Sequence, residues 1–321
     1  MVWPILRRRC VLRFRGSGRL VPWLGPTLRG LVARLFRDNV CRQPVADRFG
    51  KWRYCKGCEY MNDCSYGMTL EPDAGASEVF FQGQGDIARP VVFAPSFPCP
   101  RVCQTGTELP LEILFLGRRA AQQVEMLWAM LEKAGQRSIL GPDGIAFDVL
   151  GTEDREETIA LPTTLADEEG EIGRVEIALQ SPLTLHTERP EPGCPVRQTR
   201  WGSRPRFLLL RPTFADLFRA SARVLGALYA LEFNRRLDAD FETLKHCANE
   251  VALESASYEY FEQRRASSRS GERLARGIVG RGWYGPVPKA LFAWVQWGGV
   301  VHVGTDRVAG AGRWQLRPAS D

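Results

Sequence analysis

Long apolar runs are missing from this sequence: none reaches the ~18–20 residues that a membrane-spanning helix requires. The first few apolar residues lead directly into Arg7, Arg8 and Arg9. They are followed by neither an apolar core of signal-peptide length nor a small-residue cleavage site. These absences exclude a spanning helix and a secretory signal, so we expect a cytoplasmic protein with no membrane partner.

Histidine and lysine are scarce. The only histidines are His186, His246 and His302, so the first half of the chain has none. Any chemistry that uses histidine as an acid or base must therefore come from the second half. Because lysine is rare, arginine supplies nearly all the positive charge, and its planar guanidinium suits phosphate. A genome rich in G and C would also explain the ratio of arginine to lysine, but not how the arginines cluster.

The charge that is present is unevenly distributed. The chain has 321 residues, a hydrophobic content of 44% and a net charge of +6, which predicts a packed core and allows two ordinary domains. Residues 1–60 hold 14 lysines and arginines against three acidic residues, a local excess of 11 positive charges. The region 153–176 is acidic, and the C-terminal third is basic again. This asymmetry favours a polyanionic partner held by two basic regions.

The order of expected elements indicates the fold class. The first half predicts strands at 5–20, 91–93, 109–117 and 145–150, with helices at 28–39 and 120–134. The second half predicts strands at 173–185, 251–265, 274–284 and 298–316 (the last interrupted by a loop), with helices at 212–235 and 288–297. Both halves read β-α-β-β-α-β. We therefore predict an α+β chain with two tandem ferredoxin-like domains, 1–152 and 173–321, an acidic linker at 153–172 and a cysteine-rich loop insertion in the first domain.

The C-terminal stretch Gly298–Leu316 is interpreted as a strand, a glycine loop and a second strand. Glycines remove the Cβ atoms that block close approach of a ligand, and the arginines beside them suit phosphate. A simple glycine-rich hairpin explains the pattern equally well.

Four of the nine cysteines have a spacing that suits a metal: Cys41, Cys55, Cys58 and Cys64 read C-x13-C-x2-C-x5-C. Four thiolates are a normal ligand set for structural Zn²⁺, and C-x2-C is the usual turn. The alternative is that these cysteines are free or partly buried, and Cys99 or Cys103 would also serve as one of the ligands.

Four motifs in order along the chain resemble one family. These are Pro22–Gly30, the cluster ending Cys64–Gly67, the segment Gln263–Arg269 followed by Gly277–Gly280, and His302–Arg313. Together they resemble the CRISPR-associated RNA-processing endoribonucleases of the RAMP superfamily. The resemblance implies two ferredoxin-like domains, a repeat RNA stem-loop as ligand and no catalytic cofactor. It also implies metal-independent attack of a ribose 2′-OH that leaves a 2′,3′-cyclic phosphate.

The basic residues in and around these motifs become candidates for RNA contact. The expected RNA-binding residues are Arg29, Arg34 and Arg37 on the first helix, Arg264, Arg265, Arg269 and Arg281 on the hairpin, and Gly304, Arg307, Gly310, Gly312 and Arg313 in the terminal loop. The alternative for the arginines is a solvated face without a ligand.

Catalysis is the point at which this sequence departs from the family, whose members often place a histidine after the first helix. Lys51 and Tyr54 follow the first helix here and are the candidate acid and base. Either needs a strongly basic surround, because an unperturbed Lys or Tyr titrates near ~10. An ordinary basic loop is the alternative. His302 is the third candidate, as a base or as a structural or RNA-contacting strand residue. The missing histidine leaves a second function open, a non-catalytic RAMP subunit that binds RNA among other CRISPR effector subunits.

Overall fold

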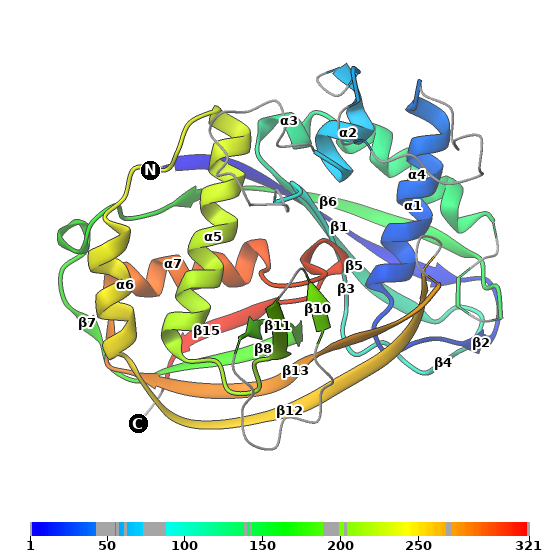
Figure 1. Cartoon of the computed structure of the whole chain (residues 1–321). Coiled ribbons are helices and arrows are strands. Elements are labelled where there is room, and N and C mark those ends of the chain that lie inside the picture. Colours follow the sequence, from blue (N-terminus) through cyan, green and yellow to red (C-terminus); the bar gives the residue numbers. More distant parts are fainter. Residues whose placement is uncertain are drawn as a thin grey trace. The chain divides into compact units, whose positions relative to one another are not determined.

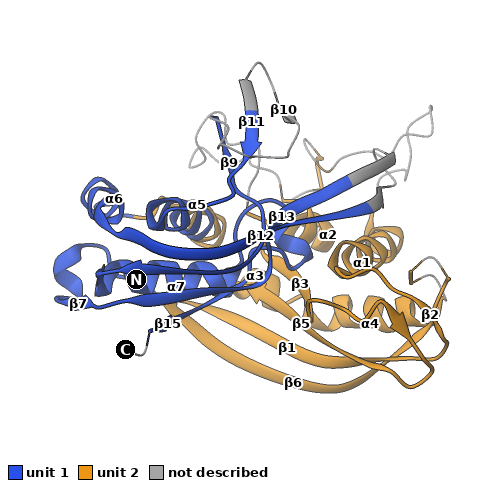
Figure 2. Cartoon of the chain, turned by 90° about the horizontal axis from the view of Figure 1, so that it is seen from below, with its two compact units in different colours: residues 1–2, 160–225, 238–321 blue, residues 3–159, 226–237 orange. Residues whose placement is uncertain are grey.

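The protein is described here by a computed structural model (Figure 1). The described residues are 2–42, 55, 58–60, 63–72, 88–137, 140–141, 143–188, 199–201, 204–267 and 271–319, without the side chains of 199–205, 265–267 and 271–273. Over these residues, no helix is both long and apolar enough to cross a membrane. The chain divides into two compact units (Figure 2), which we call the N-terminal unit (residues 3–159 and 226–237) and the C-terminal unit (residues 1–2, 160–225 and 238–321).

The N-terminal unit contains a four-stranded sheet in the order β3-β5-β1-β6. Its strands are β1 (Val2–Phe14), β3 (Val91–Pro95), β5 (Glu108–Leu116) and β6 (Phe147–Ala160), with the main helices α1 (Gly25–Val40) and α4 (Val124–Gly135). Numbered within the unit, the strand order is 2-3-1-4, which is the ferredoxin-like arrangement. Smaller elements are β2 (Gly18–Arg19) paired with β4 (Val102–Cys103), α2 (Ser65–Leu70) and α3 (Arg118–Ala121).

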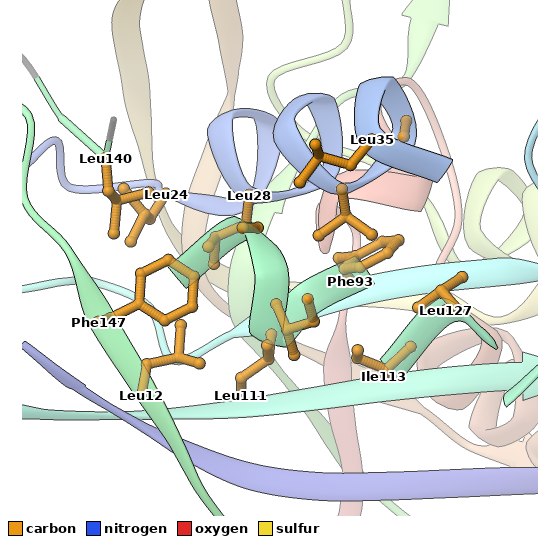
Figure 3. Close-up of a cluster of buried hydrophobic side chains, with 14 of the residues drawn as sticks. Leu12, Leu24, Leu28, Leu35, Phe93, Leu111, Ile113, Leu127, Leu140 and Phe147 are labelled. Carbon is orange, nitrogen blue, oxygen red and sulfur yellow. The ribbon is translucent and has the colours of Figure 1, made fainter. Parts of the chain in front are cut away.

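The core of this unit lies between the helices and the sheet (Figure 3). Leu28, Val32 and Leu35 recur at helical spacing and are fully buried, as are Leu111 and Ile113 on β5. Alternate residues of a strand share one face, so this pattern alone places the strand against the helix. Helix α1 begins three residues earlier than expected, because Pro26 fits the first turn, where its missing N–H is not needed.

The acidic run is a strand for part of its length, so the prediction of a linker is wrong for residues 153–160. This segment lies beside β1 in the sheet, and arginines of β1 neutralise its acidic side chains. The Arg8 guanidinium lies 2.7 Å from an Asp154 carboxylate oxygen, and Arg7 lies 3.0 Å from Glu157. Hydrogen bonding to Arg8 lowers the pKa of Asp154. This pair therefore stabilises the fold above the pKa of an unfolded aspartate, near ~4, and its contribution is lost as pH falls through the lower folded value.

Glu112 is the buried centre of this charge network, and it gives a test of the network's role in stability. It is 6% exposed and accepts hydrogen bonds from Arg7 (3.1 Å) and Arg9 (2.9 Å). We expect Glu112→Gln to lower the free energy of unfolding by about 2 kcal/mol, because it removes one of the two carboxylates that neutralise the buried Arg7 guanidinium. Glu108→Gln is the control: its partner Arg13 is half exposed, so the loss should be about 0.5 kcal/mol. Equal losses in urea titrations of the two variants would contradict the argument.

The C-terminal unit repeats the arrangement, with a sheet in the order β12-β13-β8-β15. Its strands are β8 (Val175–Leu183), β12 (Ala252–Ser267), β13 (Gly271–Gly285) and β15 (Trp314–Pro318), with helices α5 (Phe214–Phe233), α6 (Phe241–Glu250) and α7 (Lys289–Val301). Counted within the unit, the order is again 2-3-1-4. The predicted α+β class with two ferredoxin-like domains is confirmed. The last part of α5, from Gly226, groups with the N-terminal unit.

Two small sheets complete the C-terminal unit. Strand β9 (His186–Thr187) pairs with β11 (Arg204–Leu208), which also pairs with β10 (Thr199–Trp201). Strand β7 (Glu171–Ile172) pairs with β14 (Val287–Pro288).

Helix α7 corrects the prediction for the C-terminal stretch. Residues 298–301, expected to begin a strand because Val300 and Val301 are β-branched, form its last turn. Tertiary packing overrides that propensity. Gly298 and Gly299 let the helix approach its neighbours, since a Cβ atom on Gly299 would lie 2.6 Å from Trp314. The Trp314 indole N–H in turn donates to the Val295 carbonyl of α7 (2.9 Å).

Candidate nucleic-acid interface

The hairpin of β12 and β13 extends beyond its sheet. Strand β13 pairs with β8 only from Ile278 to Tyr284, whereas the β12–β13 ladder continues to Ser267 opposite Gly271. Residues 261–267 and 271–277 therefore form a two-stranded segment, which we call the distal ribbon. One face of the ribbon, with Glu262, Arg264 and Leu274, is exposed, whereas Gln263 and Ala275 on the other face are buried. The exposed face is therefore the one available to a nucleic acid.

The arginines predicted on this hairpin have different surroundings. Arg264 is exposed on the distal ribbon. Arg281 lies within the sheet and pairs with Glu176 at 3.0 Å, and Arg276 pairs with Glu262 at the same distance. The Arg265 backbone is in the ribbon and its side chain lies outside the description, as does all of Arg269. Arg264 is thus the exposed cation that the described part of the ribbon offers.

The glycine loop, residues 302–313, is mostly buried. Arg307 is 7% exposed and donates to the carbonyls of Val301 (3.1 Å) and His302 (3.2 Å). Those carbonyls end α7, so the guanidinium caps the negative end of the helix. Gly310 is buried and ends the short turn Arg307–Ala309. The loop therefore directs its central arginine inward, toward the protein.

His302 and Arg313 also make contacts within the protein. The His302 side chain is 1% exposed, and its Nδ1 lies 3.1 Å from the Ala311 carbonyl oxygen. It occupies the C-cap of α7, so the expectation of a strand residue is wrong. The backbone N–H of Arg313 donates to Ser181 (2.9 Å), and its side chain is partly exposed. Of the loop's two arginines, Arg313 is the more accessible.

Thr184 and Leu185 connect the glycine loop, the base of the distal ribbon and the small sheet of β9 and β11. The Thr305 N–H of the glycine loop donates to the Thr184 carbonyl (3.0 Å), and the Thr184 hydroxyl donates to the Arg276 carbonyl at the base of the distal ribbon. Leu185 accepts from the N–H of Leu209, next to β11. A Cβ atom on Gly304 would lie 2.5 Å from the Thr184 oxygen, so glycine is required there. The glycine loop therefore fixes the base of the ribbon.

Two basic residues at this junction were missed by sequence reasoning. His186 follows Leu185 on β9, and Arg206 lies on β11. Partial desolvation and the charge of Arg206 both lower the pKa of His186, which favours a neutral ring at pH 7. No motif marks either residue, because the small sheet that brings them together has no readable spacing in the sequence.

The arginines of α1 do not share one face. Arg34 is exposed, whereas Arg37 is 3% exposed and Arg29 donates to the Leu70 carbonyl at 3.3 Å. The reason is helix α2, which packs against α1 and brings the Tyr66 ring within 6.0 Å of Phe36. Of the three arginines expected to form a basic surface on α1, Arg34 is the exposed one.

The four candidate metal ligands lie around one pocket of about 220 Å³ in the N-terminal unit. Cys41, Cys55, Cys58 and Cys64 all line it, together with Arg37, Val40, Arg42, Tyr60, Asp63, Ser65 and Met126. The Cys58 N–H donates to the Cys55 carbonyl (2.9 Å), which closes the C-x2-C turn. Burial, and then the charge of Glu71, raise the pKa of the Cys55 thiol to about 12. Within the described ranges, no three Cys, His, Asp or Glu side chains are grouped closely enough to hold a metal ion.

Other predicted residues lie apart from this pocket or outside the description. The Cys99 thiol contacts the Ser96 carbonyl and the Cys103 thiol contacts that of Gly18, and neither lines the pocket. The candidate catalytic residues Lys51 and Tyr54 lie outside the described residues.

The strand orders define the class of this protein: two ferredoxin-like units, the second bearing a long basic hairpin and a C-terminal glycine loop. The chain belongs to the AF_1859_N family, whose N-terminal domain model matches residues 3–175. No curated protein matches it in sequence.

Solved structures with the same fold include Cas6 proteins. A Cas6 product complex has a TM-score of 0.54 and 12% sequence identity, covering 97% of this chain and 100% of its own. A second Cas6 product complex has a TM-score of 0.50 and 16% identity, covering 97% and 99%. A partial Cas6-RT-Cas1–Cas2 complex has a TM-score of 0.54 and 10% identity, covering 99% of this chain and 46% of its own. The resemblance to CRISPR RNA-processing endoribonucleases is thus confirmed as a shared fold.

Proposed function

We propose that this protein binds a stem-loop in CRISPR repeat RNA and cleaves the precursor RNA there. The observation that carries the proposal is the whole-chain likeness to a Cas6 protein in its product complex, with both chains covered almost completely. The ordered motifs of the sequence and the exposed Arg264 of the distal ribbon support the same function. RNA is accordingly the proposed partner, and no cofactor takes part in the chemistry.

The proposed reaction is an internal transfer at phosphorus. The ribose 2′-oxygen bonds to the adjacent phosphorus while the bond from phosphorus to the 5′-oxygen breaks. A base takes the 2′-OH proton and an acid supplies a proton to the leaving 5′-oxygen, which leaves a 2′,3′-cyclic phosphate and a 5′-OH. A cation is needed over the phosphate as negative charge develops.

We assign the acid and base roles to Lys51 and Tyr54, because the first 60 residues are strongly basic and family members use the segment after the first helix. The described arginines of β1 supply less of that charge than the sequence suggests, since Arg7, Arg8 and Arg9 pair with acids. We assign His302 a structural role in the glycine loop, because its ring is buried against Ala311. Phosphate contact is assigned to the distal ribbon and to Arg313.

A non-catalytic RAMP subunit of a CRISPR effector complex is the second candidate. One observation favours it: His186, His246 and His302 all belong to the C-terminal unit, so the unit expected to supply a catalytic histidine has none. In that case the protein holds RNA among other effector subunits without cutting it.

Cleavage of labelled repeat RNA in EDTA separates the two candidates. We expect a product with a 2′,3′-cyclic phosphate and no cleavage when the 2′-OH at the cut site is replaced by hydrogen. Lys51→Ala and Tyr54→Ala should each slow cleavage by about 10²-fold or more with little change in RNA affinity. Binding without cleavage would support the subunit instead. Wild-type rates for Lys51→Ala, Tyr54→Ala and His302→Ala alike would show that the catalytic assignment is wrong.

A further inference from the structure

We propose that Cys41, Cys55, Cys58 and Cys64 bind one structural zinc ion at the end of helix α1. Spacing in the sequence nominates these residues, but it cannot place them together. The structure adds the placement: one cysteine directly after α1, two on a closed turn and one at the start of α2 all line the same pocket. This proposal does not depend on the proposed RNA function.

The other described cysteines of the N-terminal unit have a different character. Cys10, Cys99 and Cys103 are buried in the hydrophobic core, and Cys99 and Cys103 contact backbone carbonyls. Such cysteines behave as small apolar residues. Cys41, Cys58 and Cys64 are instead only partly buried, and they line an opening together with Cys55, which is 8% exposed and belongs to the core. Four thiols that line one opening can coordinate a metal ion once their side chains converge, and cysteines elsewhere in the core cannot.

The charges around the pocket suit a tetrathiolate site. Each thiol loses its proton when it binds Zn²⁺, so four thiolates and the ion carry a net charge of −2. Arg37 and Arg42 line the same pocket and offset that charge, whereas Asp63, which also lines it, and Glu71, whose charge reaches Cys55, oppose them. The Arg42 guanidinium also lies 5.8 Å from the Tyr60 ring, which holds a cation beside the opening.

Zinc binding must draw the cysteines inward. Zn–S bonds are about 2.3 Å long, whereas the described cysteines are not yet grouped at ligand distance. A pocket of about 220 Å³ leaves their side chains room to converge. The ion would then join the end of α1 to the start of α2, so that binding it stabilises the segment between them.

Metal analysis of the purified full chain tests the proposal. Inductively coupled plasma mass spectrometry should find one zinc ion per chain in the wild type and in Cys247→Ser, whose thiol lies on α6 and does not line the pocket. The double variant Cys55→Ser, Cys58→Ser should hold roughly tenfold less zinc. A wild-type protein without zinc, or a double variant that holds as much, would overturn the proposal. So would iron with acid-labile sulfide in place of zinc, the other occupant that four thiolates favour.

A second measurement on the wild type covers the case in which the double variant does not fold. Titration with a thiol reagent should find four more reactive thiols after zinc is removed with a strong chelator, and adding Zn²⁺ should protect them again. Substitution with Co²⁺ should give the visible absorption of a tetrahedral thiolate site. An unchanged thiol count would contradict the proposal. Neither measurement contains RNA, so a failure here leaves the proposed function untouched, and the reverse also holds.

Discussion

Replacing Arg264, Arg265 and Arg269 together with alanine should lower the affinity for repeat RNA about 10²-fold at low salt. Arg264 is exposed on a ribbon whose described acid, Glu262, already pairs with Arg276. Each phosphate contact with a single strand contributes about 0.7 to the slope of log affinity against log salt. Losing three contacts should therefore flatten that slope by about 2. Filter binding across a salt series measures both quantities.

A matched triple variant controls for the loss of charge. Arg13, Arg15 and Arg19 lie in the N-terminal unit and pair with Glu108, Asp148 and Asp143. Replacing these three removes the same net charge but no cation that is free for phosphate, so affinity and slope should change little. Equal losses in the two variants would mean that only overall charge matters. Unchanged binding in the ribbon variant would show that RNA contacts another surface.

Gly312→Val should be the most destabilising single substitution in the glycine loop, lowering the free energy of unfolding by about 3 kcal/mol or more. Two causes combine at this position. Its backbone φ of +70° is disfavoured for a β-branched residue, and an added Cβ would collide with the Val303 carbonyl. Val303 is itself fully buried, so the backbone has no room to move away.

Gly173→Val is the control, because a Cβ atom there meets nothing within 4 Å and its φ is ordinary. In urea titrations, the free energy of unfolding of Gly312→Val should be lower than that of Gly173→Val by the whole loss expected at Gly312. RNA binding by Gly312→Val should fall together with folded protein, since the loop fixes the base of the ribbon through Thr184. A fully stable Gly312→Val that has lost RNA binding would mean that the loop contacts RNA directly.

The fold was largely predictable, because apolar residues of its core recur at strand or helix spacing. Leu109, Leu111 and Ile113 mark a strand, although both of its faces are buried from Leu111 to Leu116, and Leu28, Val32 and Leu35 mark a helix. Both patterns survive in the structure. Prediction failed where a partner far away in the sequence decides the conformation. The last turn of α7 packs Gly299 against Trp314, and residues 153–160 form a strand beside β1, where Arg8 pairs with Asp154.

The candidate site was less predictable, because a sequence does not show which charges are already paired. Arg8 and Arg264 cannot be distinguished in the sequence, because both are arginines in basic stretches. In the structure Arg8 is buried between two carboxylates, whereas Arg264 is exposed. The glycines beside Arg307 suggest a phosphate-binding loop, but its guanidinium instead caps the end of helix α7. The cysteine spacing was more informative, since the nominated residues do line one pocket.

The cysteine pocket has a consequence for how chelator experiments are interpreted. Cys41 and Cys55 bracket thirteen residues of chain, and Lys51 and Tyr54 are among them. If zinc ties those two ends together, a reaction in which no metal touches the RNA would still depend on metal through the segment to which we assign the acid and base. Brief EDTA treatment should then leave cleavage intact, while long exposure to a stronger zinc chelator abolishes it slowly. The delay would measure how long the ion stays bound. Loss of activity under chelation would then indicate the loss of a structural ion and not of a catalytic cofactor.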